Sequence, residues 1–250
     1  LPHGEAEFEE VAKAAGVGVE ALKRRASELH EFNPMLGHRG CRLGVTYPEI
    51  YEMQARAIFE AALLVKQRSG EAPIPEIMIP LVATKKELEL MKAIVDQVAK
   101  DVFAEQNASV DYLVGTMIEL PRAALKAGEI AEVGEFFSFG TNDLTQMVFG
   151  FSRDDIEQRI MGEYLSRGLL PDNPFEKLDP GAVAPLVAAA TRAGRLAHPD
   201  LEVGVCGEHG GDPTSIHLLV AAGIDYVSCS PFRVPVARLA VAQALISLDA

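Results

Sequence analysis

Three polar side chains in this sequence come at or just after the end of a short apolar run, where a strand of a parallel sheet would end. Glu119 ends the run YLVGTMIE, Asp143 follows FFSFG closely, and Cys206 ends EVGVC. Two carboxylates from consecutive strands could hold Mg²⁺, which commonly takes one or two carboxylates and fills its other positions with water and substrate oxygens. Each carboxylate could instead favour the N-terminus of a following helix. The Cys206 thiol could act as a nucleophile or a proton donor, or pack as a small apolar side chain.

Glycines accompany two further candidate segments. Residues 37–44 place Arg39 and Arg42 among glycines, a composition suited to gripping phosphate or carboxylate, unless both arginines simply face solvent. After Cys206, three glycines surround an acid and His209, which predicts either a tight turn or a mobile lid. A single loop histidine more often forms hydrogen bonds than acts as a base, so we assign His209 no catalytic role.

Strands are needed to position these side chains, and near-continuous apolar runs predict them. The clearest runs lie at residues 76–82, 112–119, 136–140, 202–206 and 226–229, with a weaker sixth run at 36–43. Helical spacing separates the runs, so we expect parallel strands joined by helical crossovers. Six strand–helix units favour a (β/α)8 TIM-type barrel that is incomplete, with about six of its eight units present. An open doubly wound sheet is the alternative, although no Gly-x-Gly-x-x-Gly segment follows the first clear strand.

Cap residues mark where several helices should begin. Thr84 and Glu87 have the spacing of a capping box, which predicts a helix through about residue 102. Pro121 predicts the start of the next helix, and Asp212 followed by Pro213 predicts an N-cap with proline at the first helical position. Further helices are expected at residues 48–66 and 234–248.

The first thirty residues read as two polar-faced helices broken by the glycines at 16–18. They resemble a peripheral element more than part of a barrel. We therefore divide the chain into an N-terminal helical segment, residues 1–32, and a barrel domain, residues 33–250.

Composition narrows the class of protein. The 250 residues are 48% hydrophobic and 24% charged, with a formal net charge of −13, which is globular and disfavours nucleic acid or an anionic membrane as a partner. Three scattered cysteines predict free thiols in a reducing compartment. No run approaches the roughly 20 uninterrupted apolar residues of a membrane span. We expect a cytoplasmic protein.

Six segments together resemble a known family. They are NPMLGHRGCR at 33–42, PEIMIP at 75–80, GTMIELPR at 115–122, FFSFGTNDLTQ at 136–146, CGEHGGDP at 206–213 and YVSCSPFRVP at 226–235. In this order they resemble the C-terminal domain of the pyruvate phosphate dikinase family, which binds phosphoenolpyruvate (PEP) and pyruvate. The resemblance extends from about residue 33 to the C-terminus, and only the opening helices match weakly.

The resemblance implies a role for each candidate residue. Mg²⁺ would be the cofactor, and Cys206 would be the acid that protonates the methylene carbon of enolpyruvate and the base that removes that proton in reverse. The thiol's ordinary pKa of about 8.5 keeps it protonated at neutral pH. Metal ligands and substrate contacts would be Glu119 and Asp143 for Mg²⁺, Gly140, Thr141 and Asn142 for substrate at the strand end, and Arg39 for the phosphoryl or carboxylate end of PEP.

The resemblance also implies partners that this chain does not contain. The family adds a nucleotide-binding region, a swivelling domain with a phosphorylated histidine, and the first two barrel strands; no segment of the Thr-x-x-Gly-Gly-x-x-Ser-His type occurs here. We expect a fragment of a homodimeric phosphotransferase that converts ATP, phosphate and pyruvate into AMP, diphosphate and PEP. The alternatives are a barrel of the PEP synthase type or of enzyme I of the sugar phosphotransferase system, or a truncated, non-catalytic dimerisation module.

Overall fold

The computed structural model describes residues 1–248 and divides the chain into two compact units, Leu1–Arg39 and Gly40–Ala250. The first unit holds helices α1 (Glu5–Ala15) and α2 (Val19–Glu28) and the 3-10 turn η1 (Pro34–Leu36). The two helices expected around the glycines at 16–18 are confirmed. The structural division falls after Arg39, whereas the sequence places the domain boundary after residue 32.

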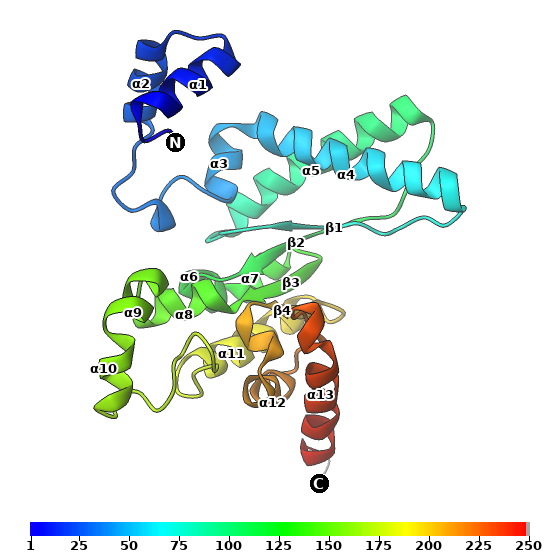
Figure 1. The fold of residues 1–250 in the computed structure, drawn as a ribbon. Helices are drawn as coiled ribbons and strands as arrows, with labels where there is room; N and C mark the ends of the chain where they lie inside the picture. Colours follow the sequence, from blue (N-terminus) through cyan, green and yellow to red (C-terminus); the bar gives the residue numbers. More distant parts are fainter. Residues whose placement is uncertain (249–250) are drawn as a thin grey trace. The chain divides into compact units, whose positions relative to one another are not determined.

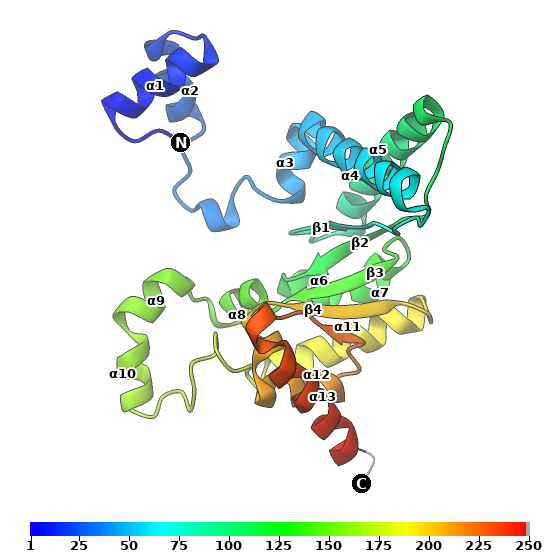
Figure 2. The ribbon, with the colours of Figure 1, turned by 45° about the vertical axis from the view of Figure 1, so that its right-hand side comes forward.

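The second unit alternates strands and helices along the chain (Figures 1 and 2). Its strands are β1 (Glu76–Ile79), β2 (Leu113–Ile118), β3 (Phe136–Gly140), β4 (Glu202–Cys206) and β5 (Tyr226–Val227). Its helices and 3-10 turns are α3 (Cys41–Thr46), α4 (Pro48–Ser69), α5 (Lys85–Gln106), α6 (Pro121–Leu125), α7 (Ala127–Ala131), α8 (Thr141–Phe149), α9 (Arg153–Arg159), α10 (Met161–Ser166), α11 (Val183–Ala197), η2 (Glu208–Gly211), α12 (Pro213–Ala221), η3 (Pro231–Arg233) and α13 (Val234–Leu248). The five clear apolar runs are therefore the five strands.

All five strands are parallel and stand in chain order, β1-β2-β3-β4-β5. Ile118 lies opposite Phe139, and Gly140 lies opposite Cys206. The carboxyl ends of β2, β3 and β4 therefore meet at one level. The prediction of parallel strands with helical crossovers is confirmed.

The two faces of the sheet carry different side chains. Alternate residues of each strand face the helices and form one continuous core with them: Ile77, Ile79, Val114, Ile118, Phe137, Phe139, Val203 and Val205. Figure 1 shows α4 and α5 beyond β1, and α11 and α12 beyond β4. The residues between them in sequence point to the opposite face. They include small, sulfur-containing and aromatic residues: Met78, Gly115, Met117, Phe136, Ser138, Gly140, Gly204, Cys206 and Tyr226.

The sixth strand expected at residues 36–43 is wrong. These residues end η1 and begin α3. Cys41 and Gly44 are buried three positions apart, which is helical spacing, and the Cys41 amide donates to the Pro80 carbonyl at 3.0 Å. The glycines of this segment hide that period in the sequence. The described chain thus has five strands rather than about six.

The predicted caps are present. Thr84 accepts a hydrogen bond from the Glu87 amide at 3.2 Å, and the Glu87 carboxylate accepts one from the Thr84 amide at 2.8 Å, which completes the capping box of α5. Asp212 accepts from the Ser215 amide at 2.7 Å and caps α12. Pro121 begins α6 as expected.

One stretch near the C-terminus is long and apolar. Within residues 1–248, only Pro231–Leu248 has the length and composition to cross a membrane, with a mean hydropathy of 1.2, and 17% of it is buried. It includes Arg233 and Arg238. A single stretch of this kind is weak evidence for a membrane protein, and its two arginines interrupt the apolar run.

Candidate active site

Three candidate residues come from neighbouring strand ends of the second unit. Glu119 directly follows β2, Gly140 is the last residue of β3, and Cys206 is the last residue of β4. Gly140 and Cys206 are paired in register. The parallel sheet therefore gathers a carboxylate, a glycine and a thiol at one edge, where the reacting groups of α/β enzymes lie.

Gly140 makes room for the buried carboxylate of Glu119. The Glu119 side chain is 3% exposed, and its Oε1 accepts a hydrogen bond from the Leu81 amide at 2.7 Å. A Cβ atom at position 140 would lie 2.6 Å from Glu119 Oε2 and 2.7 Å from Met117 Sδ. Only glycine allows so close an approach. One carboxylate oxygen is thus fixed by the backbone beyond β1, while the other lies over Gly140.

The first turn of α8 supplies the next three candidates. Thr141 is fully buried and its Oγ1 lies 3.1 Å from the Cys206 carbonyl oxygen. Asn142 Oδ1 accepts a hydrogen bond from the Glu208 amide at 3.3 Å. Asp143 accepts one from Gln146 Nε2 at 3.0 Å and stands in the first turn of its helix, where the dipole favours a negative charge. Thr141 and Asn142 therefore contact the chain on either side of Gly207, the residue that follows β4.

Cys206 is a partly buried free thiol, and Cys41 and Cys229 are free as well. Its Sγ lies 3.7 Å from the Phe139 carbonyl oxygen. Burial raises the pKa of this thiol, and the charges of Glu119 and Asp143 raise it further, whereas a hydrogen bond with Ser138 lowers it. The thiol is therefore protonated at neutral pH, as a proton donor must be.

The carboxylates fit a small divalent cation. Glu119 and Asp143 offer hard oxygen donors from adjacent strand ends, and Mg²⁺ needs only one or two such groups from a protein. Nowhere in residues 1–248 do three or more His, Cys, Asp or Glu side chains gather with the geometry of a metal cluster. Glu119 does not cap α6. The N-cap of that helix is Leu120, and the Glu119 carboxylate accepts a hydrogen bond from the Leu81 amide instead.

Arg39 belongs to the first unit, whereas the other six candidates belong to the second. It is the last residue of that unit, and its Nη1 lies 3.5 Å from the Met35 carbonyl oxygen and 3.4 Å from Met35 Sδ. The structure brings together Glu119, Gly140, Thr141, Asn142, Asp143 and Cys206 in the second unit.

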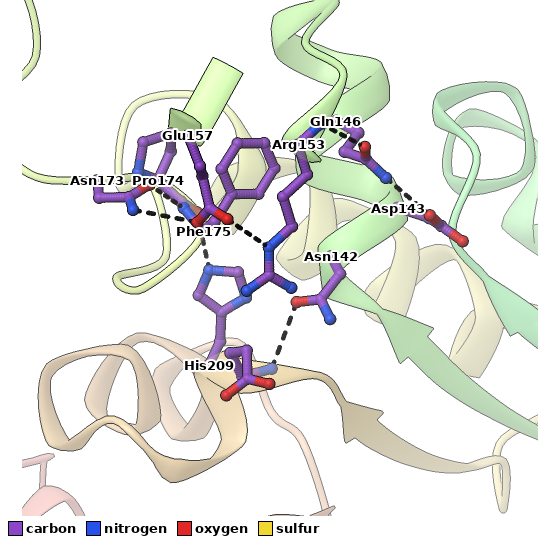
Figure 3. A network of polar contacts seen from close by, with 10 residues as sticks. Asn142, Asp143, Gln146, Arg153, Glu157, Asn173, Pro174, Phe175 and His209 are labelled. Atoms are coloured by element: carbon purple, nitrogen blue, oxygen red, sulfur yellow. Dashed lines mark hydrogen bonds and ion pairs between the residues drawn. The ribbon is translucent and has the colours of Figure 1, made fainter. Parts of the chain in front are cut away.

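Arg153 is a residue beside the site that no sequence pattern singled out. Its amide donates to Gln146 Oε1 at 2.8 Å, and Gln146 in turn donates to Asp143. Its guanidinium donates to Glu157 at 3.3 Å and lies 5.7 Å from the centre of the Phe175 ring. Figure 3 shows this guanidinium pointing toward Asn142. The sequence feature that points to Arg153 is Gln146, the last residue of the motif at 136–146. Its side chain connects Asp143 in the first turn of α8 to the first residue of α9.

His209 is a buried structural residue of the site. Its imidazole is fully buried, with Nδ1 2.7 Å from Thr141 Oγ1 and Nε2 2.9 Å from the Pro174 carbonyl oxygen. The sequence expectation of a hydrogen-bonding residue is confirmed. Of the two alternatives for the glycine-rich segment, the structure has the tight turn, η2, with His209, Gly210 and Gly211 all buried.

Comparisons with known proteins agree with this geometry. The model of the family described as "PEP-utilising enzyme, PEP-binding domain" matches residues 9–246. The pyruvate, phosphate dikinase of Rhizobium meliloti (strain 1021) is 55% identical over 247 residues, and that of Clostridium symbiosum is 54% identical over 247 residues. Each alignment covers 99% of this chain but only 27% and 28% of the respective relative.

A solved citrate lyase from Burkholderia xenovorans LB400 aligns with a TM-score of 0.47 and 15% identity, over 77% of this chain and 53% of that chain. So weak a likeness carries no argument about the fold. The family match, in contrast, spans nearly every residue described, including all six site residues of the second unit. The chain therefore belongs to the PEP-utilising enzymes and corresponds to their PEP-binding domain.

Proposed function

We propose that this chain is the PEP- and pyruvate-binding part of a pyruvate phosphate dikinase, a phosphotransferase. The single observation that carries the proposal is the register of Gly140 with Cys206 beside Glu119, which gathers carboxylate and thiol at one sheet edge. The relatives at 54–55% identity carry the name of the dikinase, which favours it over PEP synthase and enzyme I.

The proposed local reaction moves a phosphoryl group between PEP and a histidine on a separate swivelling domain. The bond between phosphorus and the enol oxygen breaks, and a bond between phosphorus and a histidine nitrogen forms. The Cys206 thiol then gives its proton to the methylene carbon of the enolate, which yields pyruvate and leaves a thiolate. In reverse, the thiolate removes a methyl proton from pyruvate. In the full enzyme, pyruvate, ATP and phosphate would give PEP, AMP and diphosphate.

Charge must be balanced at this site, because the protein is acidic and the substrate is an anion. Glu119 and Asp143 would hold Mg²⁺, which when bound would stabilise negative charge on the enolate oxygen and the phosphoryl group. Gly140, Thr141 and Asn142 would contact the substrate, Thr141 through its main chain, because its hydroxyl is buried and bound within the protein. Arg39 would bind its phosphoryl or carboxylate end. Arg153 is a further cation whose guanidinium points toward Asn142 (Figure 3).

We propose that the sheet is one wall of a (β/α)8 barrel. The core joins helices to one face of the strands, as in a barrel, whose helices form an outer ring around the sheet. The relatives are several times longer than this chain, so the remaining strands would come from elsewhere in the full protein. We further propose a cytoplasmic homodimer without nucleic-acid or membrane partners, in keeping with its charge and free thiols.

The proposal is tested by replacing Cys206 in the full-length protein that carries this chain. Cys206→Ala should abolish the exchange of pyruvate methyl protons with solvent, followed by NMR in deuterium oxide, because no other thiol ends a strand beside the carboxylates. Phosphohistidine formation from ATP should continue at the parental rate. Cys229→Ala is the matched control, since Cys229 is another partly buried free thiol, and it should exchange as the parent does.

Undiminished exchange in Cys206→Ala would remove the thiol from its proposed role. A parent protein that forms phosphohistidine from ATP but never exchanges methyl protons would favour the non-catalytic dimerisation module.

A further inference from the structure

The buried imidazole of His209 joins three segments that lie far apart in the sequence. His209 belongs to η2, the turn that follows Cys206. Its Nδ1 lies 2.7 Å from the hydroxyl of Thr141 in α8, and its Nε2 lies 2.9 Å from the carbonyl of Pro174, in the loop between α10 and α11. Figure 3 shows the ring between η2 and that loop.

The partners of the ring fix its protons. A carbonyl oxygen only accepts, so Nε2 must carry the hydrogen that it donates to Pro174. Burial lowers the pKa of His209; Asp212 and Glu208 act in the opposite direction, and Arg153 acts with burial. The ring is thus neutral, and its Nδ1 accepts the Thr141 hydroxyl proton. The same hydroxyl lies 3.1 Å from the Cys206 carbonyl oxygen, so its one proton is shared between the ring nitrogen and that carbonyl.

The hydroxyl held by His209 lies directly against the turn after Cys206. Gly207 has a φ of 114°, and a Cβ atom there would lie 2.7 Å from Thr141 Oγ1. Next in the chain, the Glu208 amide is bound by Asn142. Two residues of α8, Thr141 and Asn142, therefore contact this turn. The position of the Thr141 hydroxyl depends on the His209 imidazole that binds it.

We propose that His209 is a positioning residue, whose imidazole clamps the turn after Cys206 to the first turn of α8 and to the loop at Pro174, and so sets the direction of the thiol. The inference rests on the proposed function of Cys206. It assigns His209 no contact with substrate and no proton transfer. Its effect is on the rate of the thiol-dependent step, since displacing a reacting group by about 1 Å can cost on the order of 100-fold.

Two substitutions in the full-length protein each preserve one half of the clamp. In His209→Asn, the amide oxygen can replace Nδ1 and accept from Thr141, whereas the bond to Pro174 is lost. In His209→Gln, the amide nitrogen can reach the position of Nε2 and donate to Pro174, whereas Thr141 is released. Each variant loses one buried hydrogen bond, so both should lose similar stability in thermal unfolding.

The clamp predicts that their catalysis differs. In pyruvate methyl-proton exchange, His209→Gln should lose on the order of 100-fold in kcat with KM within about twofold of the parent, while His209→Asn should stay within about tenfold. Phosphohistidine formation from ATP should be parental in both. Equal losses in the two variants, or a rise in KM with kcat unchanged, would overturn the proposal and leave His209 a stabilising residue only.

Thr141→Val provides a second route if either histidine variant does not fold. It removes the hydroxyl at nearly constant volume and should lower kcat as His209→Gln does, with KM unchanged. A raised KM with parental kcat would instead mark the Thr141 hydroxyl itself as a substrate contact and overturn the clamp. Failure of the proposed function is a separate result, because it would appear as parental exchange in Cys206→Ala.

Discussion

At the scale of single residues, Gly140 determines the position that the Glu119 carboxylate can occupy. Glu119 Oε2 fits over Gly140 because this residue has no side chain, and Glu119 Oε1 is held by the Leu81 amide. A buried carboxylate has few other positions, since an unpaired charge in the interior is costly. The candidate metal ligand and the glycine on the next strand therefore function as one unit.

Gly140→Ala should disturb this unit. The added methyl group would meet Glu119 Oε2 at 2.6 Å and Met117 Sδ at 2.7 Å, so the carboxylate must move. We expect Mg²⁺ affinity, measured by calorimetry, to fall at least about tenfold, and stability to fall by about 1–3 kcal/mol.

Gly162→Ala is the matched control for this substitution. A Cβ at Gly162 in α10 meets nothing within 4 Å, so Mg²⁺ binding should be unchanged and the helix slightly stabilised. Unchanged Mg²⁺ affinity in Gly140→Ala would contradict the role of Glu119 as a ligand.

The thiol of Cys41 predicts how stability depends on pH. It is fully buried and its Sγ lies 3.2 Å from the Leu81 carbonyl; burial, with help from the charge of Glu87, raises its pKa from 9.0 to about 12. The folded state thus holds this proton more tightly than the unfolded state. The stabilisation is complete below pH 9 and is lost as the pH rises toward 12.

Cys41→Ala should therefore flatten the alkaline loss of stability. Urea unfolding between pH 9 and 11 should show a parent slope steeper than that of the variant by up to about 1.4 kcal/mol per pH unit. Only the difference is informative, because Tyr51 and Tyr112 also have raised pKa values. Parallel slopes would contradict the prediction.

At the scale of elements, the sequence predicts what is encoded locally. The apolar runs at 136–140 and 202–206 coincide with β3 and β4, because a strand covered by helices needs no polar alternation. The predicted strand at 36–43 is wrong because glycines obscure the helical period of this segment.

Contacts between segments far apart in the chain have no corresponding pattern in the local sequence. Six of the seven candidate site residues could be placed at strand ends because β–α units repeat along the chain. The contact of His209 with Thr141 spans 68 residues and that with Pro174 spans 35, and no local pattern encodes either. The same holds for Arg153 and Phe175, which meet only after the loop between α10 and α11 folds back.

The capping box at the start of α5 gives a prediction at this scale. Thr84→Ala removes the acceptor of the Glu87 amide and should lower the free energy of unfolding by about 1 kcal/mol in urea titrations. Ser152→Ala is the control, because Ser152 is the N-cap of α9 but its side chain bonds Asp155 and caps no backbone amide. It should change stability by only a few tenths of a kcal/mol. Equal effects would contradict the assignment.

At the scale of the whole second unit, the sheet leaves part of one face open. Met78 lies on the face opposite the helices and is 36% exposed. If that face lines a closed barrel in the full-length protein, as we propose, Met78 becomes buried there. An aspartate at this position would then be an unpaired charge in the interior.

Met78→Asp should thus behave differently in two contexts. In the 250-residue chain it should be tolerated and should reduce self-association in sedimentation experiments, because it places a charge on an open face. In the full-length protein it should lower the melting temperature by several degrees. Met53→Asp, at a methionine of α4 that is 59% exposed, should have neither effect. An unaltered melting temperature for full-length Met78→Asp would contradict barrel closure.

The chain order of the strands has a consequence for how this protein tolerates change. Each strand lies beside its predecessor, and every crossover leaves from the carboxyl edge and returns on the helical side. Insertions within a crossover helix, or between that helix and the next strand, would enlarge the helical layer. They would not shift the carboxyl ends of the strands, where the site residues lie. Relatives can therefore differ in helix length while their reacting atoms keep the same spacing, and deletions are expected to be harmful mainly in the short joints just after β2, β3 and β4.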